Sequence, residues 1–381
     1  MGKKIKIMTV FGTRPEGIKM APLIKELENE PDIFDVKNII TAQHREMLDQ
    51  VLKIFKIKPD FDLNIMKSNQ SLAEITSKVL LELEKIFESE NPDLILVHGD
   101  TTTTFAASLS AFYHQIAIGH VEAGLRTWNK YSPFPEEMNR EMVDDLSDLY
   151  FAPTAKNFEN LIQEHQKKNN IFITGNTGID ALKYTVNDNF DSLAFKDIDF
   201  TKKIILLTAH RRENQGLKME RMFKAILEVV QSDQDLELVY PVHRSPAVQK
   251  VAHDVFDGCK QVKLIDPLDV VHFHNLIQRS FVVLSDSGGV QEEAPALNKP
   301  VLVLRDTTER PEAVETGAIR LVGTESSQIK KSLIKLIEDP KEYRNMATAK
   351  NPYGDGNASC RIVKAIKYHF GLVTDRPDNF Y

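Results

Sequence analysis

The sequence is poor in cysteine and has no long apolar run. Its 381 residues include two cysteines, Cys259 and Cys360, and one tryptophan. Two cysteines outside any C-x-x-C spacing favour reduced, independent thiols over a disulfide framework, a zinc site or a redox motif. No apolar stretch approaches the roughly 20 residues of a membrane-spanning helix, and the first residues carry no signal-peptide pattern. We therefore expect a cytoplasmic protein that makes no contact with a membrane.

The sequence also has no excess of basic charge and no nucleotide fingerprint of the common kinds. It has 48 Lys and Arg residues against 55 Asp and Glu residues, which gives a net charge of -7. This balance argues against nucleic acid as the main partner. Neither G-x-G-x-x-G nor a Walker loop is present, so nicotinamide and ATP are not indicated. His272 and His274 flank Phe273 but diverge on a helix, and we predict no metal site.

What the sequence does contain is a regular alternation of short apolar runs and amphipathic stretches. Apolar residues at positions 72, 75, 79, 83 and 86, for example, follow a helical period. Such alternation predicts parallel sheets with right-handed crossovers, and the length suggests two domains. The expected strands are Ile5–Phe11, Val36–Thr41, Leu94–His98, Ile116–Val121, Ile204–Thr208, Leu236–Pro241, Val262–Ile265, Phe281–Leu284 and Val301–Leu304.

The connection between the two domains is placed in the stretch Asn176–Phe200. Strand signals are weak there, and Asp and Asn residues are frequent. We therefore expect an N-terminal Rossmann-like domain over residues 1–176 and a second one over residues 177–357. Ligands of open parallel sheets bind beyond the carboxyl ends of the strands. Polar clusters that directly follow the expected strands are accordingly the candidates for function.

Four such clusters lie in the first half of the chain. The turn after the first strand leads into a helix N-terminus beside Arg14, which favours a phosphate group. Asp100 and Glu122 follow two further strands, and both are suited to acid–base chemistry. The alternative for Asp100 is to cap the next helix, and the alternative for Glu122 is a structural ion pair with Arg126. Glu136 and Glu137 open a helix, where part of their role is to complement its dipole.

Two clusters in the second half favour an anion. His210, Arg211 and Arg212 follow the strand Ile204–Thr208. A solvated charged loop is the alternative to an anion site there. The segment Ser285–Ala294 follows another strand and opens a helix, and its small residues allow backbone amides to approach a pyrophosphate. Glu293, one turn into that helix, is placed to reach ribose hydroxyls, and the loop Arg305–Glu312 follows the next strand.

With these clusters in order, the sequence resembles the non-hydrolysing UDP-N-acetylglucosamine 2-epimerases nearly from end to end. The resemblance implies a glycosyltransferase-B-like fold of two Rossmann-like domains facing each other across a cleft. It implies that the C-terminal segment, residues 358–381, packs back on the first domain and contains a helix at about Ala358–Phe370. It also implies a homodimer without a metal or other cofactor. The matching motifs are Phe11–Glu16, Gln43–Arg45, His98–Thr101, His120–Thr127, Pro135–Arg140, Thr174–Thr177, His210–Asn214, Ser285–Glu293, Arg305–Pro311 and Asn351–Gly356.

The resemblance further implies a reaction and assigns residues to it. UDP is eliminated in anti fashion across C1–C2 to give 2-acetamidoglucal and then adds back, so that UDP-N-acetylglucosamine and UDP-N-acetylmannosamine interconvert. Proton exchange at C2 falls to three carboxylates, and the leaving pyrophosphate is stabilised by cations and amides. The catalytic positions are Asp100, Glu122, Glu136 and His210. The substrate-binding positions are Arg14, Lys19, Phe273 (uracil), Ser287, Gly288, Gly289, Glu293 (ribose) and Arg310.

Many bacterial members of that family bind a second substrate molecule as an allosteric activator. Gln43, Arg211 and His243 match positions associated with that site. Glu46 and Asn69 depart from the pattern, because Gln and Arg are common at these positions. The lost positive charge at position 69 is expected to weaken the activator site.

Three alternatives remain at this stage. A hydrolysing 2-epimerase has the same fold but releases UDP and N-acetylmannosamine. A glycosyltransferase of the same fold needs an acceptor surface, and no basic, aromatic or amphipathic stretch indicates one. A nucleotide-sugar-binding protein without catalysis is disfavoured by the three carboxylates Asp100, Glu122 and Glu136.

Overall fold

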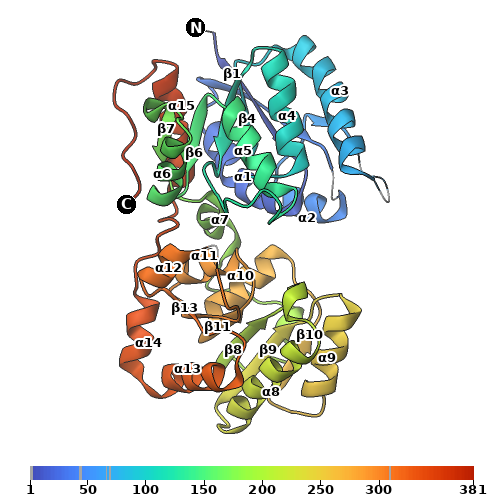
Figure 1. Ribbon diagram of the computed structural model, residues 1–381, viewed down its shortest axis with the longest axis vertical. Helices are drawn as coiled ribbons and strands as arrows, with labels where there is room; N and C mark the ends of the chain where they lie inside the picture. Colours follow the sequence, from blue (N-terminus) through green and yellow to red (C-terminus); the bar gives the residue numbers. More distant parts are fainter. Residues whose placement is uncertain (1–2, 43–44, 66, 68–69, 309) are drawn as a thin grey trace. The chain divides into compact units, whose positions relative to one another are not determined.

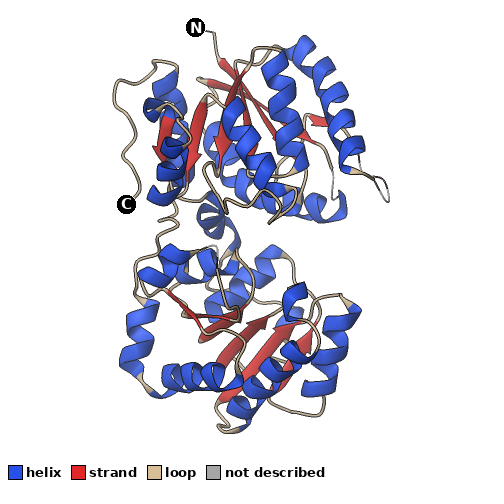
Figure 2. Cartoon of the chain, viewed as in Figure 1, coloured by secondary structure: helices blue, strands red, loops and turns tan. Residues whose placement is uncertain are grey.

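The computed structural model describes the whole chain except residues 1–2, 43–44, 66, 68–69 and 309 (Figure 1). The chain folds into two compact units. The first consists of Met1–Tyr184 together with Tyr353–Tyr381, and the second of Thr185–Pro352. Each contains one parallel sheet with helices on its faces, as the ribbon coloured by secondary structure shows (Figure 2). The predicted class, two Rossmann-like α/β domains of the glycosyltransferase-B-like kind, is thereby confirmed.

The first unit is built on a parallel sheet of seven strands among the described residues. Its strand order is β3-β2-β1-β4-β5-β6-β7, so the chain reverses direction across the sheet between β1 and β4. The strands are β1 (Ile5–Phe11), β2 (Phe34–Ile40), β3 (Phe61–Asp62), β4 (Leu94–His98), β5 (Ala117–Val121), β6 (Leu149–Ala152) and β7 (Ile171–Ile173). The helices are α1 (Arg14–Glu28), α2 (Arg45–Phe55), α3 (Leu72–Glu90), α4 (Thr102–Tyr113), α5 (Glu136–Leu146), α6 (Ala155–Gln163), α7 (Thr177–Thr185) and α15 (Ala358–His369), with a 3₁₀ turn at Lys168–Asn170.

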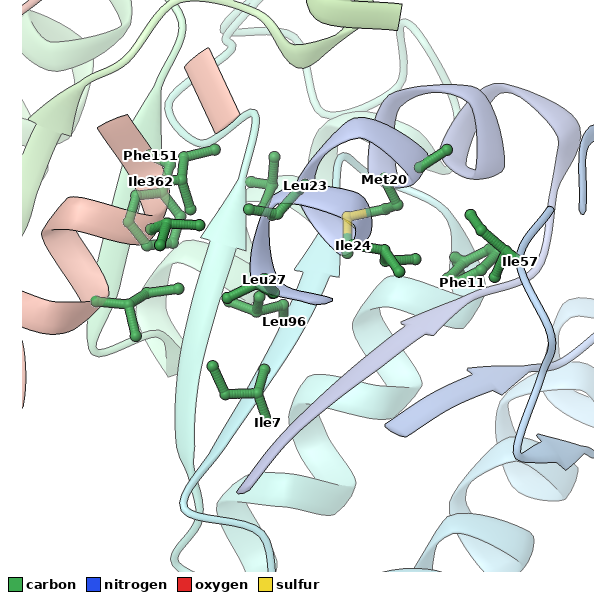
Figure 3. Close-up of a cluster of buried hydrophobic side chains, with 14 of the residues drawn as sticks. Ile7, Phe11, Met20, Leu23, Ile24, Leu27, Ile57, Leu96, Phe151 and Ile362 are labelled. Atoms are coloured by element: carbon green, nitrogen blue, oxygen red, sulfur yellow. The ribbon is translucent and has the colours of Figure 1, made fainter. Parts of the chain in front are cut away.

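The central strands read as continuous apolar runs because both faces of the sheet are covered. On one face, Ile7 and Phe11 of β1 pack with Leu23 and Leu27 of α1 and with Ile362 of α15 (Figure 3). A separate cluster on the other face joins the same strands to α3 and α4. The helix α15 therefore belongs to the core of the first unit although it lies at the end of the sequence.

The second unit has a parallel sheet of six strands among the described residues, in the order β10-β9-β8-β11-β12-β13. The strands are β8 (Lys203–Thr208), β9 (Leu236–Pro241), β10 (Val262–Ile265), β11 (Val282–Ser285), β12 (Val301–Val303) and β13 (Ile319–Leu321). The helices are α8 (Leu217–Gln231), α9 (Pro246–Phe256), α10 (Val270–Arg279), α11 (Val290–Ala296), α12 (Pro311–Glu315), α13 (Ser326–Glu338) and α14 (Pro340–Ala347), with 3₁₀ turns at Leu193–Phe195 and Arg212–Asn214. Its reversal point lies between β8 and β11.

The units divide at places that differ from the expected boundaries. The first division falls after Tyr184 rather than after Asn176, because α7 packs with the first unit. The chain returns to the first unit at Tyr353, ahead of α15. Asp180 of α7 explains this early return, since its carboxylate accepts hydrogen bonds from the amides of Ala358 (3.1 Å) and Ser359 (2.7 Å) and so caps the N-terminus of α15.

Candidate functional site

In the first unit, the candidate residues follow three adjacent strands. Arg14 is the first residue of α1, directly beyond β1, while Asp100 follows β4 and Glu122 follows β5. Glu136 is the first residue of α5. Because β1, β4 and β5 are neighbours in a parallel sheet, these loops emerge at the same edge.

A buried carboxylate that the sequence analysis did not single out ties two of these loops together. One oxygen of Glu16 accepts hydrogen bonds from the amides of Gly12 (3.0 Å) and Thr13 (2.7 Å). The other accepts from the hydroxyls of Thr101 (2.7 Å) and Thr104 (3.0 Å). Burial raises the pKa of Glu16, although hydrogen bonds from Thr101, Thr13 and Gly12 act in the opposite direction. Glu16 therefore fixes the loop that carries Arg14 relative to the loop that carries Asp100.

Asp100 does not cap α4, which was the alternative to a catalytic role. Thr101 is the N-cap, and its hydroxyl accepts from the amide of Thr104. The Asp100 carboxylate instead forms an ion pair with Arg140 of α5. The side-chain amide of Asn139 donates a hydrogen bond of 2.9 Å to the backbone carbonyl of Asp100. Asp100 is thus held in place by α5 and remains partly exposed to solvent.

Glu122 is the most constrained of the three carboxylates. Its Oε2 is ion-paired with Lys19 of α1 and accepts a hydrogen bond of 2.8 Å from Asn176. The Nε2 atom of His98 lies 3.8 Å away. Burial lowers the pKa of His98 to about 3, against the attraction of Glu122, so this ring is neutral near pH 7. Glu122 also has a φ of 69°, a left-handed conformation that non-glycine residues adopt rarely and often at functional sites.

The two adjacent glutamates at the start of α5 have different surroundings. Glu137 is fully buried, accepts hydrogen bonds of 2.7 Å from the amides of Thr127 and Trp128, and lies 3.2 Å from Arg140. These bonds give Glu137 a structural role. Glu136 is only partly buried and is the one of the pair that is available to a ligand.

Arg126 was considered as a partner of Glu122, but it pairs elsewhere. Its guanidinium binds the fully buried Asp144 (2.7 Å) and Glu164. Asp144 also contacts His120 (2.6 Å between Oδ1 and Nδ1), whose other ring nitrogen lies 2.8 Å from the carbonyl of Gly99. This buried network supports the turn before Asp100. Its central residue, Asp144, lies in the last turn of α5, where no motif drew attention to it.

In the second unit, the loop after β8 is organised by Asp286. The buried carboxylate of Asp286 accepts hydrogen bonds from the amides of His210 (3.0 Å) and Arg211 (2.9 Å) and from the side chain of Asn214 (3.1 Å). The ring of His210 stacks on that of His243, with 5.3 Å between centroids. Burial lowers the pKa of His210, with Asp286 opposing this effect. His210 can therefore change its protonation state when an anion binds beside it.

The glycine loop after β11 brings a guanidinium against the backbone. A Cβ on Gly288 would lie 2.9 Å from Cζ and Nη1 of Arg310, whereas a Cβ on Gly289 would meet only Glu293, at 3.6 Å. Arg310 is held in this position by a hydrogen bond of 2.8 Å from its Nε to Glu292. The amide of Ser287 already donates to the hydroxyl of Ser285 at 2.9 Å. Arg310 and the amides of the two glycines are thus the candidates for anion binding in this loop.

The residues proposed for the nucleoside lie on neighbouring helices of the second unit. Phe273 is on α10 and partly buried, and Glu293 is on α11, 3.5 Å from His274. A cavity of about 720 Å³ lies at the carboxyl ends of β9 and β10 and is lined in part by Leu264, Ile265 and Leu268. Its position fits the rule for ligand sites of parallel sheets.

The residues expected at an allosteric site are only partly described. Gln43 and Asn69 lie outside the described residues, as does the side chain of Glu46. The side chain of Arg211 donates from Nε to the carbonyl of Asp286 at 2.8 Å, and His243 is exposed apart from its stacking on His210.

Neither a metal centre nor a membrane segment enters the site as described. Among the described residues, the one group with suitable ligand atoms within 4.8 Å of one another comprises Glu84 and Glu88 of α3 and His114. It includes none of the candidate carboxylates and is largely exposed. No helix in the described part of the chain is long and apolar enough to cross a membrane.

Comparison with known proteins gives consistent results. The family model described as UDP-N-acetylglucosamine 2-epimerase matches residues 25–367. A UDP-N-acetylglucosamine 2-epimerase of Bacillus subtilis is 58% identical over 99% of this chain and 99% of its own length. A crystal structure of a UDP-N-acetylglucosamine 2-epimerase has a TM-score of 0.93 and 56% identity, with both chains covered completely. The Neisseria meningitidis enzyme bound to UDP-GlcNAc has a TM-score of 0.87 and 51% identity, over 95% of this chain and 99% of that one.

Proposed function

Because this chain belongs to the UDP-N-acetylglucosamine 2-epimerase family, we propose that it interconverts UDP-N-acetylglucosamine and UDP-N-acetylmannosamine without net hydrolysis. The Neisseria relative binds the first of these nucleotide sugars. The observation that carries the proposal is the set of three carboxylates, Asp100, Glu122 and Glu136, at one edge of the first sheet. Two of them are held by fixed cations and amides.

The proposed chemistry couples the loss of the C2 proton to the departure of UDP, so that no carbanion has to form at an unactivated carbon. A carboxylate takes the proton from C2 while the C1–O bond breaks, and its electron pair leaves with the UDP oxygen. A C1–C2 double bond remains, which makes the intermediate 2-acetamidoglucal. A proton is then delivered to the other face of C2 as the UDP oxygen attacks C1. Exchange from both faces requires more than one acid–base group, which three carboxylates provide.

The departing UDP needs stabilisation of its developing charge. Preorganised donors and cations are the most effective means of stabilising such charge. In the second unit, His210, Arg310 and the amides of Gly288 and Gly289 are the proposed donors and cations. In the first unit, Arg14 and Lys19 are the basic positions proposed for the substrate. Phe273 and Glu293 are the proposed partners of uracil and ribose.

Amide variants test the assignment of the carboxylates. We expect Asp100→Asn, Glu122→Gln and Glu136→Gln each to lower kcat at least about 100-fold, because general acid–base catalysis typically accelerates a reaction by about 10²- to 10⁴-fold. UDP affinity, measured by titration calorimetry, should change little. Asp145→Asn is the matched control, since Asp145 is an exposed carboxylate of the same helix. Normal turnover of all three amide variants would contradict the assignment.

We also propose that the protein is a homodimer. Large apolar side chains that are exposed on the neighbouring helices α3 and α4 support this proposal: Leu72 and Leu81 on one helix, and Phe112 and Tyr113 on the other. Light scattering of the purified protein tests this proposal, and a mass of 43.3 kDa, that of one chain, would contradict it. The allosteric role of Gln43, Arg211 and His243 stays a prediction.

A further inference from the structure

Asn176, the residue before α7, is fixed on three sides and contacts a proposed catalytic carboxylate. It is 4% exposed. Its backbone amide donates to the carbonyl of Tyr353 at 2.7 Å, and its side-chain oxygen accepts from the amide of Gly178 at 2.8 Å. The side-chain nitrogen donates to Oε2 of Glu122 at 2.8 Å. Because the oxygen accepts from a backbone N–H, the amide has one sensible orientation, with its NH₂ group toward Glu122.

The groups around Glu122 come from three elements and differ in character. Lys19 of α1 contributes a positive charge, His98 of β4 a neutral ring, and Asn176 a neutral donor. A neutral donor fixes a carboxylate oxygen without adding a second cation, which would make the carboxylate a weaker base. The positive φ of Glu122 shows that the backbone there also adopts an uncommon conformation to present this side chain.

Gly178 allows both donors to approach. A Cβ at this position would lie 3.2 Å from the side-chain oxygen of Asn176 and 3.5 Å from Cγ of Lys19. The start of α7 is thus closely fitted to the two groups that hold Glu122. The same corner contacts the returning chain, since Gly175 has a φ of 85° and its Cβ position would lie 3.3 Å from Gly354.

We propose that Asn176 is a positioning residue that orients the Glu122 carboxylate and keeps it ionised for proton exchange at C2. The inference rests on the proposed function. Asn176 touches no reacting atom in this account and acts only through Glu122. Its loss should therefore lower kcat and alter the pH dependence, while the binding of UDP is retained.

Two substitutions and one control test this inference. Asn176→Ala removes the donor, and we expect kcat to fall about 10- to 100-fold, the usual range for losing a hydrogen bond to a charged group. Asn176→Asp keeps the acceptor for Gly178 but places an oxygen where the donor stood. Thr177→Val is the matched control, because the Thr177 hydroxyl is buried without a hydrogen-bond partner in the described part of the chain.

The pH profile separates positioning from a general structural effect. In Asn176→Asp, two carboxylates share one site, so the pKa of one of them rises strongly. The acidic limb of the kcat profile should then move to higher pH by at least about one unit. Activity at pH 7 should fall below that of Asn176→Ala, with UDP affinity within about threefold of the wild type. Wild-type kcat in Asn176→Ala, an unmoved limb in Asn176→Asp, or an equal loss in Thr177→Val would overturn the inference.

A structural readout keeps this inference distinct from the proposed function. If the wild type shows no epimerisation, the proposed function fails. The role of Asn176 is then read from crystal structures of the variants. We expect the Glu122 carboxylate to change its orientation beside Lys19 in Asn176→Ala, which removes the donor, and to keep it in Thr177→Val. An unchanged Glu122 carboxylate in Asn176→Ala would overturn the inference independently of activity.

Discussion

Substitution of Gly288 by alanine should weaken nucleotide binding without unfolding the second unit. The new methyl group would lie 2.9 Å from both Cζ and Nη1 of Arg310. Carbon atoms in contact prefer roughly 3.5–4.0 Å, so the guanidinium has to retreat by at least about half an ångström. Arg310 is the far end of a flexible side chain, and it can move at little cost to the stability of the fold.

The substitution is expected to lower the affinity for the nucleotide rather than the stability of the fold. A hydrogen bond to a charged group contributes about 1.5–3 kcal/mol, and a displaced guanidinium forfeits a large part of it. A loss of about 1–2 kcal/mol corresponds to about 5- to 30-fold weaker binding. The hydrogen bond from Arg310 to Glu292 resists the movement, which makes a fully compensating rearrangement unfavourable.

Titration calorimetry with UDP and thermal unfolding are the assays, and Gly289→Ala is the matched control. A Cβ on Gly289 would meet only Glu293, at the ordinary contact distance of 3.6 Å, and would leave Arg310 in place, so this variant should lose less UDP affinity than Gly288→Ala. The reasoning is refuted if Gly288→Ala binds UDP normally. It is also refuted if both variants lose affinity to the same extent.

Two further predictions concern the carboxylates that support the first unit. Glu16→Gln puts an amide NH₂ group against two of the four donors that meet at Glu16, and it should lower the free energy of unfolding by about 2–4 kcal/mol in urea denaturation. Glu74→Gln, in the exposed capping box of α3, is the control and should lower the free energy of unfolding by much less than Glu16→Gln. Burial alone would raise the pKa of Asp144, but the interactions with His120 and Arg126 are stronger and lower it. The ionised Asp144 therefore stabilises the fold at pH values above the pKa that this carboxyl group has in the unfolded chain. Asp144→Asn should lower the free energy of unfolding by about 3–5 kcal/mol between pH 5 and 8. The difference in the free energy of unfolding between this variant and the wild type should shrink below about pH 4. A difference that grows at low pH would contradict the assignment.

The sequence predicted the strands well where they are long and apolar. The observed bounds of β1, β4 and β9 are those expected, because strands covered on both faces are largely apolar. The strands β6 and β7 were not predicted, since β7 has three residues and short runs carry little periodicity. The helix α7 was likewise hidden in a stretch rich in Asp and Asn, which read as a connection. Its place is set by contacts with residues near Ala358, far away in sequence.

For the candidate site, the sequence indicated which loops matter but not what holds them. The clusters that follow β1, β4 and β5 do lie at one edge of the sheet. The supporting residues Glu16, Asp144 and Asp286 were not recognised as such. Thr13 and Glu16 do form a local T-x-x-E capping box, but the hydrogen bonds from Thr101 and Thr104 to Glu16 come from residues distant in sequence. The partners of Asp144 and Asp286 are also distant, for example His210, which lies 76 positions before Asp286. Such long-range contacts leave no local pattern, because they are defined only by the folded chain.

The most direct test of the proposed function is proton NMR of UDP-N-acetylglucosamine with the purified protein in D₂O. We expect UDP-N-acetylmannosamine to appear with deuterium at C2 and no net loss of nucleotide sugar, because the carboxylates exchange protons with solvent while UDP is retained. Accumulation of free UDP and N-acetylmannosamine would contradict the non-hydrolysing account, and epimerisation without deuterium at C2 would contradict proton exchange. An unchanged substrate, even with a little of the epimer added, would contradict the proposed activity itself.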